Sequence, residues 1–184
     1  FDKVFSVTVT NVNEAPTALT GSLSVSENAA IGTVIGTLTG SDPEGDALSY
    51  SLTSNPGKLF AINATTGVVT VAGALDYEAL GATPQITVQV TDPDHLSFSK
   101  VFAVALADVN EAPSQPVITK LVTSVEEADH PDHLAMPADI KLGTLAATDP
   151  DTNPVYQSLV YSVTDPNFEI RSGNELWLKA SGRL

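Results

Sequence analysis

Aspartate and glutamate residues recur at the predicted turns of this 184-residue sequence. Twelve of them stand in or beside turns: Glu27, Asp42, Glu44, Asp46, Asp76, Glu78, Asp92, Asp94, Asp108, Glu111, Asp149 and Asp151. Many form Asp-x-Glu or Asp-x-Asp pairs, whose spacing places two carboxylates on the same side of an extended segment. A hard cation such as calcium takes about six to eight oxygen ligands from carboxylates, carbonyls and Asn side chains. A calcium site is therefore the chemistry that these residues could support.

The overall composition excludes several other classes of function. The sequence has 8 Lys and Arg against 22 Asp and Glu, a formal net charge of −14, so it lacks the basic stripe that nucleic-acid binding needs. The absence of cysteine excludes disulfides, thiol catalysis and Cys-based zinc sites. The longest purely apolar run, residues 101–107, is far shorter than the roughly 18 residues of a membrane span.

The elements that must position the carboxylates are repeated along the chain. Residues 3–16 align with residues 100–113 with 9 identities in 14 positions, at an offset of 97 residues. A period of this length indicates tandem domains rather than a short-repeat solenoid. We therefore expect residues 1–12 to be the last strand of a preceding repeat and residues 13–110 to be a complete repeat. Residues 111–184 would be a second repeat, truncated before its last two strands.

Apolar residues alternate with polar ones within each repeat, as in Ile86, Val88 and Val90 or in Phe102, Val104 and Leu106. This alternation is typical of strands with one buried face. About seven short strands are expected in each repeat and no convincing helix. The pattern predicts an all-β fold of tandem antiparallel β-sandwiches.

Each acidic motif also has a simpler interpretation. Residues 42–46, Asp-Pro-Glu-Gly-Asp, form a good β-turn sequence in any protein. Asp76 and Glu78 could be solvated loop residues, and Asn-Glu-Ala-Pro could be a stiff linker in which proline only forces an extended chain. Their recurrence in the same order in two copies favours the metal site.

These motifs resemble tandem cadherin repeats of the bacterial, adhesin-type branch, over essentially the whole chain. The motifs that carry the resemblance are Ser26-Glu27-Asn28, residues 60–67, Leu75-Asp76-Tyr77-Glu78, Val90-Thr91-Asp92 and residues 108–113. The resemblance implies Greek-key sandwiches of the immunoglobulin-like, cadherin type. It also implies an extracellular or cell-surface repeat module that calcium rigidifies, with a role in calcium-dependent, homophilic cell adhesion.

The resemblance further implies which residues bind calcium. Carried over residue by residue, the ligands of one junction between repeats would be Glu27, Asp76, Glu78, Asp108, the Val109 carbonyl, Asn110, Glu111, Asp149 and Asp151. An upstream junction would keep Asn13, Asp42, Glu44 and Asp92, with Asn11 in place of the family's Asp, and we expect that site to be partial or empty. The implied partners are other repeats of the same chain and another cell-surface protein or glycan.

Electrostatics supports this assignment independently of the resemblance. If the carboxylates of the first set converge, each neighbouring pair repels by roughly 4 kcal/mol at an effective dielectric near 20. No Lys or Arg stands within these motifs to offset the repulsion. We expect divalent cations to offset it and to convert a flexible two-domain chain into a rod.

The sequence leaves two other classes of function open. For an enzyme, the sequence has no Gly-x-Ser-x-Gly, His-Glu-x-x-His or phosphate-loop motif. His130, Asp132 and His133 could begin a transition-metal site, but such a loop is more often solvated. Carboxylate pairs for glycoside hydrolysis would fall at repeat ends rather than in a cleft.

The second class is a passive spacer or a carbohydrate-binding module of a larger secreted protein or enzyme. Trp177 lies between Leu176 and Leu178 and so faces the other side of its strand, where it could form one exposed platform. Asn63-Ala64-Thr65 is a glycosylation sequon, which matters in a eukaryotic secretory context.

Overall fold

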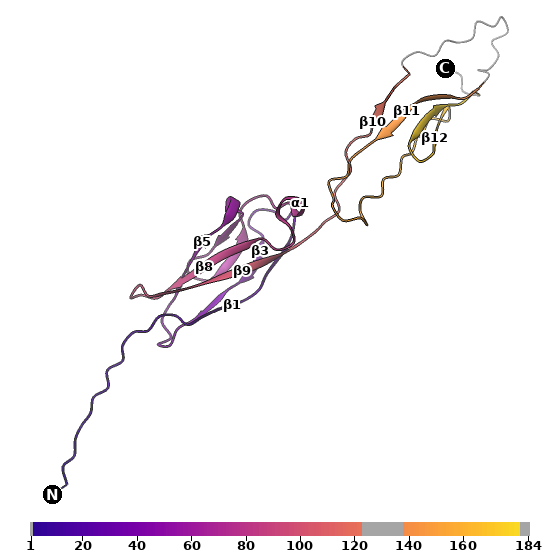
Figure 1. The fold of residues 1–184 in the computed structure, drawn as a ribbon. Coiled ribbons are helices and arrows are strands. Elements are labelled where there is room, and N and C mark those ends of the chain that lie inside the picture. Colours follow the sequence, from indigo (N-terminus) through magenta and orange to yellow (C-terminus); the bar gives the residue numbers. More distant parts are fainter. Residues whose placement is uncertain (1, 123–137, 181–184) are drawn as a thin grey trace, which may run out of the picture. The chain divides into compact units, whose positions relative to one another are not determined.

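A computed structural model describes residues 2–122 and 138–180 of the chain (Figure 1). The chain divides into two compact units, residues 1–109 and residues 110–184. Most of the regular structure that is described in both units is β-strand, which confirms the predicted all-β fold.

The first unit is built from two main sheets. Its strands are β1 (Ala18–Thr20), β2 (Leu23–Ser26), β3 (Val34–Thr37), β4 (Thr39–Ser41), β5 (Ser49–Ser54), β6 (Phe60–Ile62), β7 (Val68–Val71), β8 (Gln85–Thr91) and β9 (Ser97–Ala107). One sheet has the order β2-β9-β8-β5 and the other β3-β7-β6, while β1 pairs with β4. Strand β2 runs parallel to β9, and the other pairs of this unit are antiparallel. If β1 with β2 and β3 with β4 each count as one interrupted strand, the unit has the seven strands that were predicted.

The core of the first unit follows the predicted alternation. In β8 and β9, the apolar residues at every second position are 0% to 7% exposed: Ile86, Val88, Val90, Phe102, Val104 and Leu106. They pack in one cluster with apolar residues of the opposite sheet, among them Ile35, Phe60, Val69 and Val71. Burying an aliphatic side chain of this size stabilises the fold by about 1.5–3 kcal/mol. The two sheets therefore form one sandwich with a shared core, and this packing holds the turns at the ends of the strands in place.

The expectation of no helix was wrong at one turn. Helix α1 (Tyr77–Leu80) forms a single turn, and the 3-10 helix η1 covers Pro56–Lys58. Asp76 caps α1, because its side-chain Oδ1 accepts a hydrogen bond of 2.8 Å from the backbone N–H of Ala79. A helix of four residues is too short to show a period of 3.6 residues in the sequence, so only the capping residue signals it.

The described part of the second unit forms one antiparallel sheet. Its strands are β10 (Val117–Thr119), β11 (Ile140–Ala146), β12 (Phe168–Arg171) and β13 (Glu175–Leu178), in the order β10-β11-β13-β12. Leu145 and Leu178 are 8% and 1% exposed. Leu159, Tyr161 and Val163 alternate with other residues in the same way as Leu48, Tyr50 and Leu52 of the first repeat, which predicts a strand, but the structure has none at residues 159–163. A strand needs a hydrogen-bonded neighbour, and none of the described residues of this unit pairs with that segment.

Some of the predicted boundaries are not tested. Residues 2–12 carry no strand, and four of their apolar side chains are 80% to 96% exposed: Val4, Phe5, Val7 and Val9. Their assignment to a preceding repeat stays a prediction, as does the truncation of residues 111–184. The predicted histidine loop with His130, Asp132 and His133 lies outside the described residues.

Candidate metal centre

Three carboxylates of the first unit meet at one end of the sandwich. Glu27 follows β2, while Asp76 and Glu78 stand at the beginning of α1. One carboxylate oxygen from each of the three lies within 4.8 Å of the others. Sequence reasoning placed these residues in one ligand set, and the structure brings them together from segments about 50 residues apart.

Backbone N–H groups hold Glu27 in place. Its Oε2 accepts a hydrogen bond of 2.5 Å from the Tyr77 N–H, and its Oε1 accepts one of 2.7 Å from the Val109 N–H. The side chain is buried, with 3% of its surface exposed. Both donors are backbone N–H groups, so they orient the two carboxylate oxygens without a cationic side chain that would compete with a metal ion.

Asp108 and Val109 directly follow β9, and Val109 supplies one of the two N–H groups that donate to Glu27. Asp108 Oδ1 is buried and has no hydrogen-bond partner in the described structure. An unsatisfied buried oxygen of this kind destabilises a fold by about 1–3 kcal/mol or more, and a bound cation would satisfy it. The contact shown for Val109 is through its N–H, so the predicted role of its carbonyl as a ligand stays a prediction.

The predicted ligands of the second unit are held together at its beginning. Asp151 Oδ2 accepts a hydrogen bond of 3.0 Å from the Glu111 N–H, and Asp149 Oδ1 accepts one of 3.1 Å from the Asp151 N–H. Asn110 Nδ2 donates to the Glu111 carbonyl at 3.2 Å. The turn at residues 149–151 is thus bound to the segment that enters the unit, as sequence reasoning requires of a shared ligand set.

A second acidic cluster lies at the other end of the first unit. Asn13 Nδ2 donates to Asp92 Oδ2 at 2.9 Å, and the Glu44 N–H donates to Asp42 Oδ1 at 3.0 Å. The Glu44 carboxylate accepts hydrogen bonds of 3.2 Å from Asn11 Nδ2 and from the Glu14 N–H. The upstream residues predicted from the resemblance therefore form two hydrogen-bonded pairs, Asn13 with Asp92 and Asp42 with Glu44. Asp42 Oδ2 is buried without a partner in the described structure.

Sequence reasoning left Asp46 and Asp94 out of this upstream ligand set, although both had been counted among the turn carboxylates. The pKa of Asp46 is raised, first by desolvation and then by the charges of Asp42, Glu44, Asp92 and Asp94. Its backbone N–H also donates to Asp42 Oδ1 at 3.3 Å. The charges of four neighbouring carboxylates thus add to desolvation in raising the pKa of Asp46, and a divalent cation at this cluster would oppose their effect.

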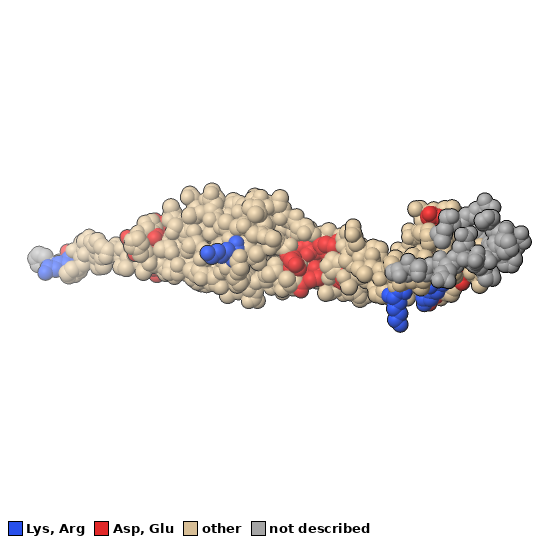
Figure 2. Space-filling view, turned by 90° about the horizontal axis from the view of Figure 1, so that it is seen from above, with Lys and Arg blue, Asp and Glu red and all other residues tan. Residues whose placement is uncertain are grey.

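The described residues fit a hard cation better than a transition metal. The groups at both clusters are carboxylates and Asn amides, whose oxygens are the ligands that calcium prefers. The space-filling view shows a surface that is mostly uncharged, with acidic side chains gathered in patches (Figure 2). The acidic side chains are therefore concentrated at a few places on the surface, and these are the places where a divalent cation could bind.

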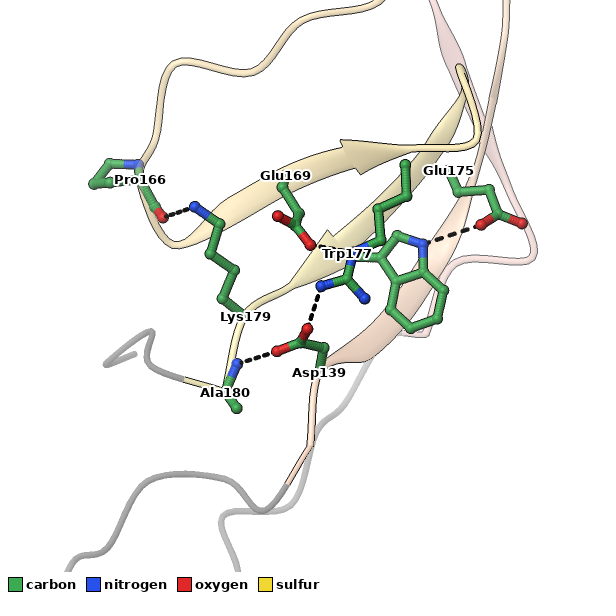
Figure 3. Close-up of polar contacts among 8 residues, drawn as sticks. Asp139, Pro166, Glu169, Glu175, Trp177, Lys179 and Ala180 are labelled. Atoms are coloured by element: carbon green, nitrogen blue, oxygen red, sulfur yellow. Dashed lines mark hydrogen bonds and ion pairs between the residues drawn. The ribbon is translucent and has the colours of Figure 1, made fainter.

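Trp177, which could have formed an exposed aromatic platform, is partly buried and lies among polar side chains of its sheet (Figure 3). The guanidinium carbon of Arg171 lies 4.7 Å from the centre of the Trp177 ring, and the indole Nε1 donates to Glu175 Oε2 at 3.2 Å. Arg171 is itself held by ion pairs with Asp139 and Glu169. Trp177 is thus packed against its neighbours, and this sheet face does not favour the carbohydrate-binding alternative.

No helix among the described residues is both long enough and apolar enough to cross a membrane.

Comparisons with known proteins agree with the fold. Residues 21–123 match the family model of the cadherin domain. The chain is 34% identical to rat Cadherin-17 over 174 residues, which cover 93% of this chain and 19% of that protein. It is 35% identical to human Protocadherin beta-1 over 113 residues, which cover 58% of this chain and 14% of that protein. The chain thus spans about a fifth or less of the length of these relatives.

Solved structures show the same architecture. The structure of human Protocadherin-24 EC1-2, Form II, has a TM-score of 0.68 at 26% identity and covers 85% of this chain and 72% of its own. The structure of Drosophila N-cadherin EC1-4 has a TM-score of 0.67 at 21% identity and covers 89% of this chain and 41% of its own.

Proposed function

Because the chain belongs to the cadherin family, we propose that its acidic clusters bind calcium and that the bound ions stiffen the connection between consecutive repeats. The observation that carries the proposal is the convergence of Glu27, Asp76 and Glu78 within 4.8 Å. The remaining proposed ligands are Asp108 and Val109 of the first unit and Asn110, Glu111, Asp149 and Asp151 of the second.

Repulsion within the cluster is the physical reason for binding. At 4.8 Å and an effective dielectric near 20, two carboxylates repel by about 3.5 kcal/mol. Solvent screening at the exposed Asp76 reduces the repulsion in its two pairs. Folding brings these charges together, because Glu27 is fixed by backbone N–H groups and Asp76 by the cap of α1. A calcium ion supplies two positive charges, and it stabilises the folded arrangement by an amount that grows with the logarithm of its concentration above the dissociation constant.

Each residue of the cluster contributes to binding in its own way. Glu27 is the buried, rigid ligand, since both of its oxygens are already oriented by N–H donors. Glu78 and Asp76 stand on α1, where the capping bond between Asp76 and Ala79 limits their motion. A site with such preoriented oxygens loses little conformational entropy when the ion binds.

The family is one of extracellular and cell-surface proteins, and this chain is an extracellular or cell-surface repeat module. We further propose that it serves calcium-dependent cell adhesion as one part of a longer row of repeats, with partner repeats of the same kind on the facing surface. We infer no catalytic role, since the cadherin family consists of adhesion proteins. The upstream cluster at Asn13, Asp42, Glu44 and Asp92 would serve the junction with a preceding repeat.

Small-angle X-ray scattering of the 184-residue chain tests the stiffening. With calcium, the distance distribution should narrow and the flexibility seen in a Kratky plot should fall, relative to the same sample in chelator. Identical curves in both buffers would rule out calcium-dependent stiffening. A bead-aggregation assay with and without calcium then separates adhesion from a passive spacer role, because a spacer produces no aggregation in either buffer.

A further inference from the structure

The turn between β6 and β7 carries a feature that calcium binding does not use. Asn63-Ala64-Thr65 is the one Asn-x-Ser/Thr sequence in the 184 residues. All three residues and the following Thr66 are exposed. The turn lies outside both acidic clusters, so its chemistry is independent of theirs.

Hydrogen bonds within this turn orient the Asn63 side chain. Its Oδ1 accepts bonds of 3.0 Å from the backbone N–H groups of Thr65 and Thr66. Gly67, with φ of +67°, closes the turn by donating its N–H to the Asn63 carbonyl at 3.0 Å. The structure shows the carboxamide engaged through its oxygen, and its Nδ2 has no partner among the described residues. A substituent on Nδ2 would therefore leave every bond of the turn intact.

We propose that Asn63 is the acceptor of an N-linked glycan. In this transfer, Nδ2 forms a bond to the anomeric carbon of a lipid-pyrophosphate-linked oligosaccharide. The bond between that carbon and the pyrophosphate oxygen breaks, and Nδ2 gives up one proton. The Thr65 hydroxyl, which is exposed beside Asn63, completes the acceptor sequence. Related cadherins occur in rat and human, whose secretory pathway supplies this donor, and the proposal applies to the chain when it is secreted by such a pathway.

The position of the glycan gives it a structural consequence. Strand β6 lies at the edge of the β3-β7-β6 sheet, and its residues pair only with β7. The turn is also tied to the edge strand β5 of the other sheet, since the Tyr50 N–H donates to the Ala64 carbonyl at 2.9 Å. A bulky polar group at the end of an exposed edge strand opposes edge-to-edge pairing between chains. The glycan would thus keep this edge of the first unit free of contacts between copies.

Mass spectrometry of the 184-residue chain, secreted from cultured animal cells, tests the proposal. The intact mass should exceed the sequence mass by one glycan, and peptide mapping after glycosidase treatment should show Asp at position 63. Asn63→Gln and Thr65→Ala should each abolish the added mass, while Thr65→Ser should retain it. Thr66→Ala is the matched control, because it changes a neighbouring threonine of the same turn outside the sequon and should leave the glycan in place.

Thermal unfolding gives a second readout. Since glycosylation leaves the turn's bonds intact, the unfolding midpoints of the glycosylated and enzymatically deglycosylated chains should agree within about 3 °C. Secreted, folded chain without a glycan on Asn63 would overturn the proposal, and so would a glycan that persists in Thr65→Ala.

Discussion

Replacing Glu27 with Gln removes one charge from the centre of the first unit's acidic cluster and conserves the size of the side chain. In chelator, the change has two opposing effects. It removes repulsion of up to about 3.5 kcal/mol toward each of Asp76 and Glu78. It also weakens the hydrogen bonds from Tyr77 and Val109, which are worth about 1.5–3 kcal/mol each to a charged acceptor. Stability in chelator is therefore not the diagnostic quantity.

The diagnostic quantity is the stability gained when calcium is added. A carboxylate about 2.5 Å from a divalent ion contributes about 3 kcal/mol even at the dielectric of water, so losing it weakens binding by roughly 100-fold. At a calcium concentration of 100 times the dissociation constant, the original chain gains about 2.7 kcal/mol. The variant at the same concentration gains about 0.4 kcal/mol. At about 4 °C for each kcal/mol, the calcium-induced rise of the unfolding midpoint should shrink by about 9 °C.

Circular dichroism during heating, in calcium and in chelator, measures this rise. Asp165→Asn is the matched control, because Asp165 is exposed, lies outside the acidic clusters and loses the same charge. Glu78→Gln is the second test variant, since it leaves the backbone bonds of Glu27 intact. An unchanged calcium-induced rise in both Glu27→Gln and Glu78→Gln would refute the assignment of this cluster.

Three further predictions concern other parts of the chain. The pKa of Asp46 is raised in the folded chain, so its negative charge opposes folding at neutral pH. Asp46→Asn should therefore raise the unfolding midpoint in chelator. An unchanged midpoint would contradict the repulsion between Asp46 and the neighbouring carboxylates. The pKa of Asp139 is lowered, first by the Ala180 N–H and then by the Arg171 guanidinium. Its stabilisation should therefore be complete above about pH 5 and be lost as the pH falls below about 4, and a pH series of unfolding should show this loss diminished in Asp139→Asn. Gly67→Ala should destabilise the first unit by about 1–3 kcal/mol in denaturant titrations. A Cβ at position 67 would lie 2.2 Å from the Leu38 carbonyl oxygen, and the backbone φ of +67° is one that alanine rarely adopts. An unchanged midpoint would contradict the described turn.

The sandwich was predictable where burial dictates the sequence pattern. Val88 and Val104 must be apolar because both are fully buried, and the alternation on their strands follows from that burial. Helix α1 was not predictable, since one turn carries no periodic signal. The missing strand at residues 159–163 shows the reverse case, in which local sequence favours a strand but pairing requires a neighbour.

The candidate site was predictable in its membership but not in its internal contacts. The resemblance to cadherin repeats implied one ligand set that includes Glu27, Asp76 and Glu78, and in the structure one carboxylate oxygen of each lies within 4.8 Å of the others. The bonds from Tyr77 and Val109 to Glu27 involve backbone N–H groups, which are the same for any residue type and so leave no trace in the sequence. Asp46 was missed for a related reason, because its interaction with its neighbours depends on how the turn at residues 42–46 folds.

Isothermal titration of the calcium-stripped 184-residue chain with calcium tests the central claim most directly. We predict a saturable binding heat that is reduced in Glu27→Gln and Glu78→Gln and unchanged in Asp165→Asn. A silent titration, or one that is the same in all four proteins, would contradict the account.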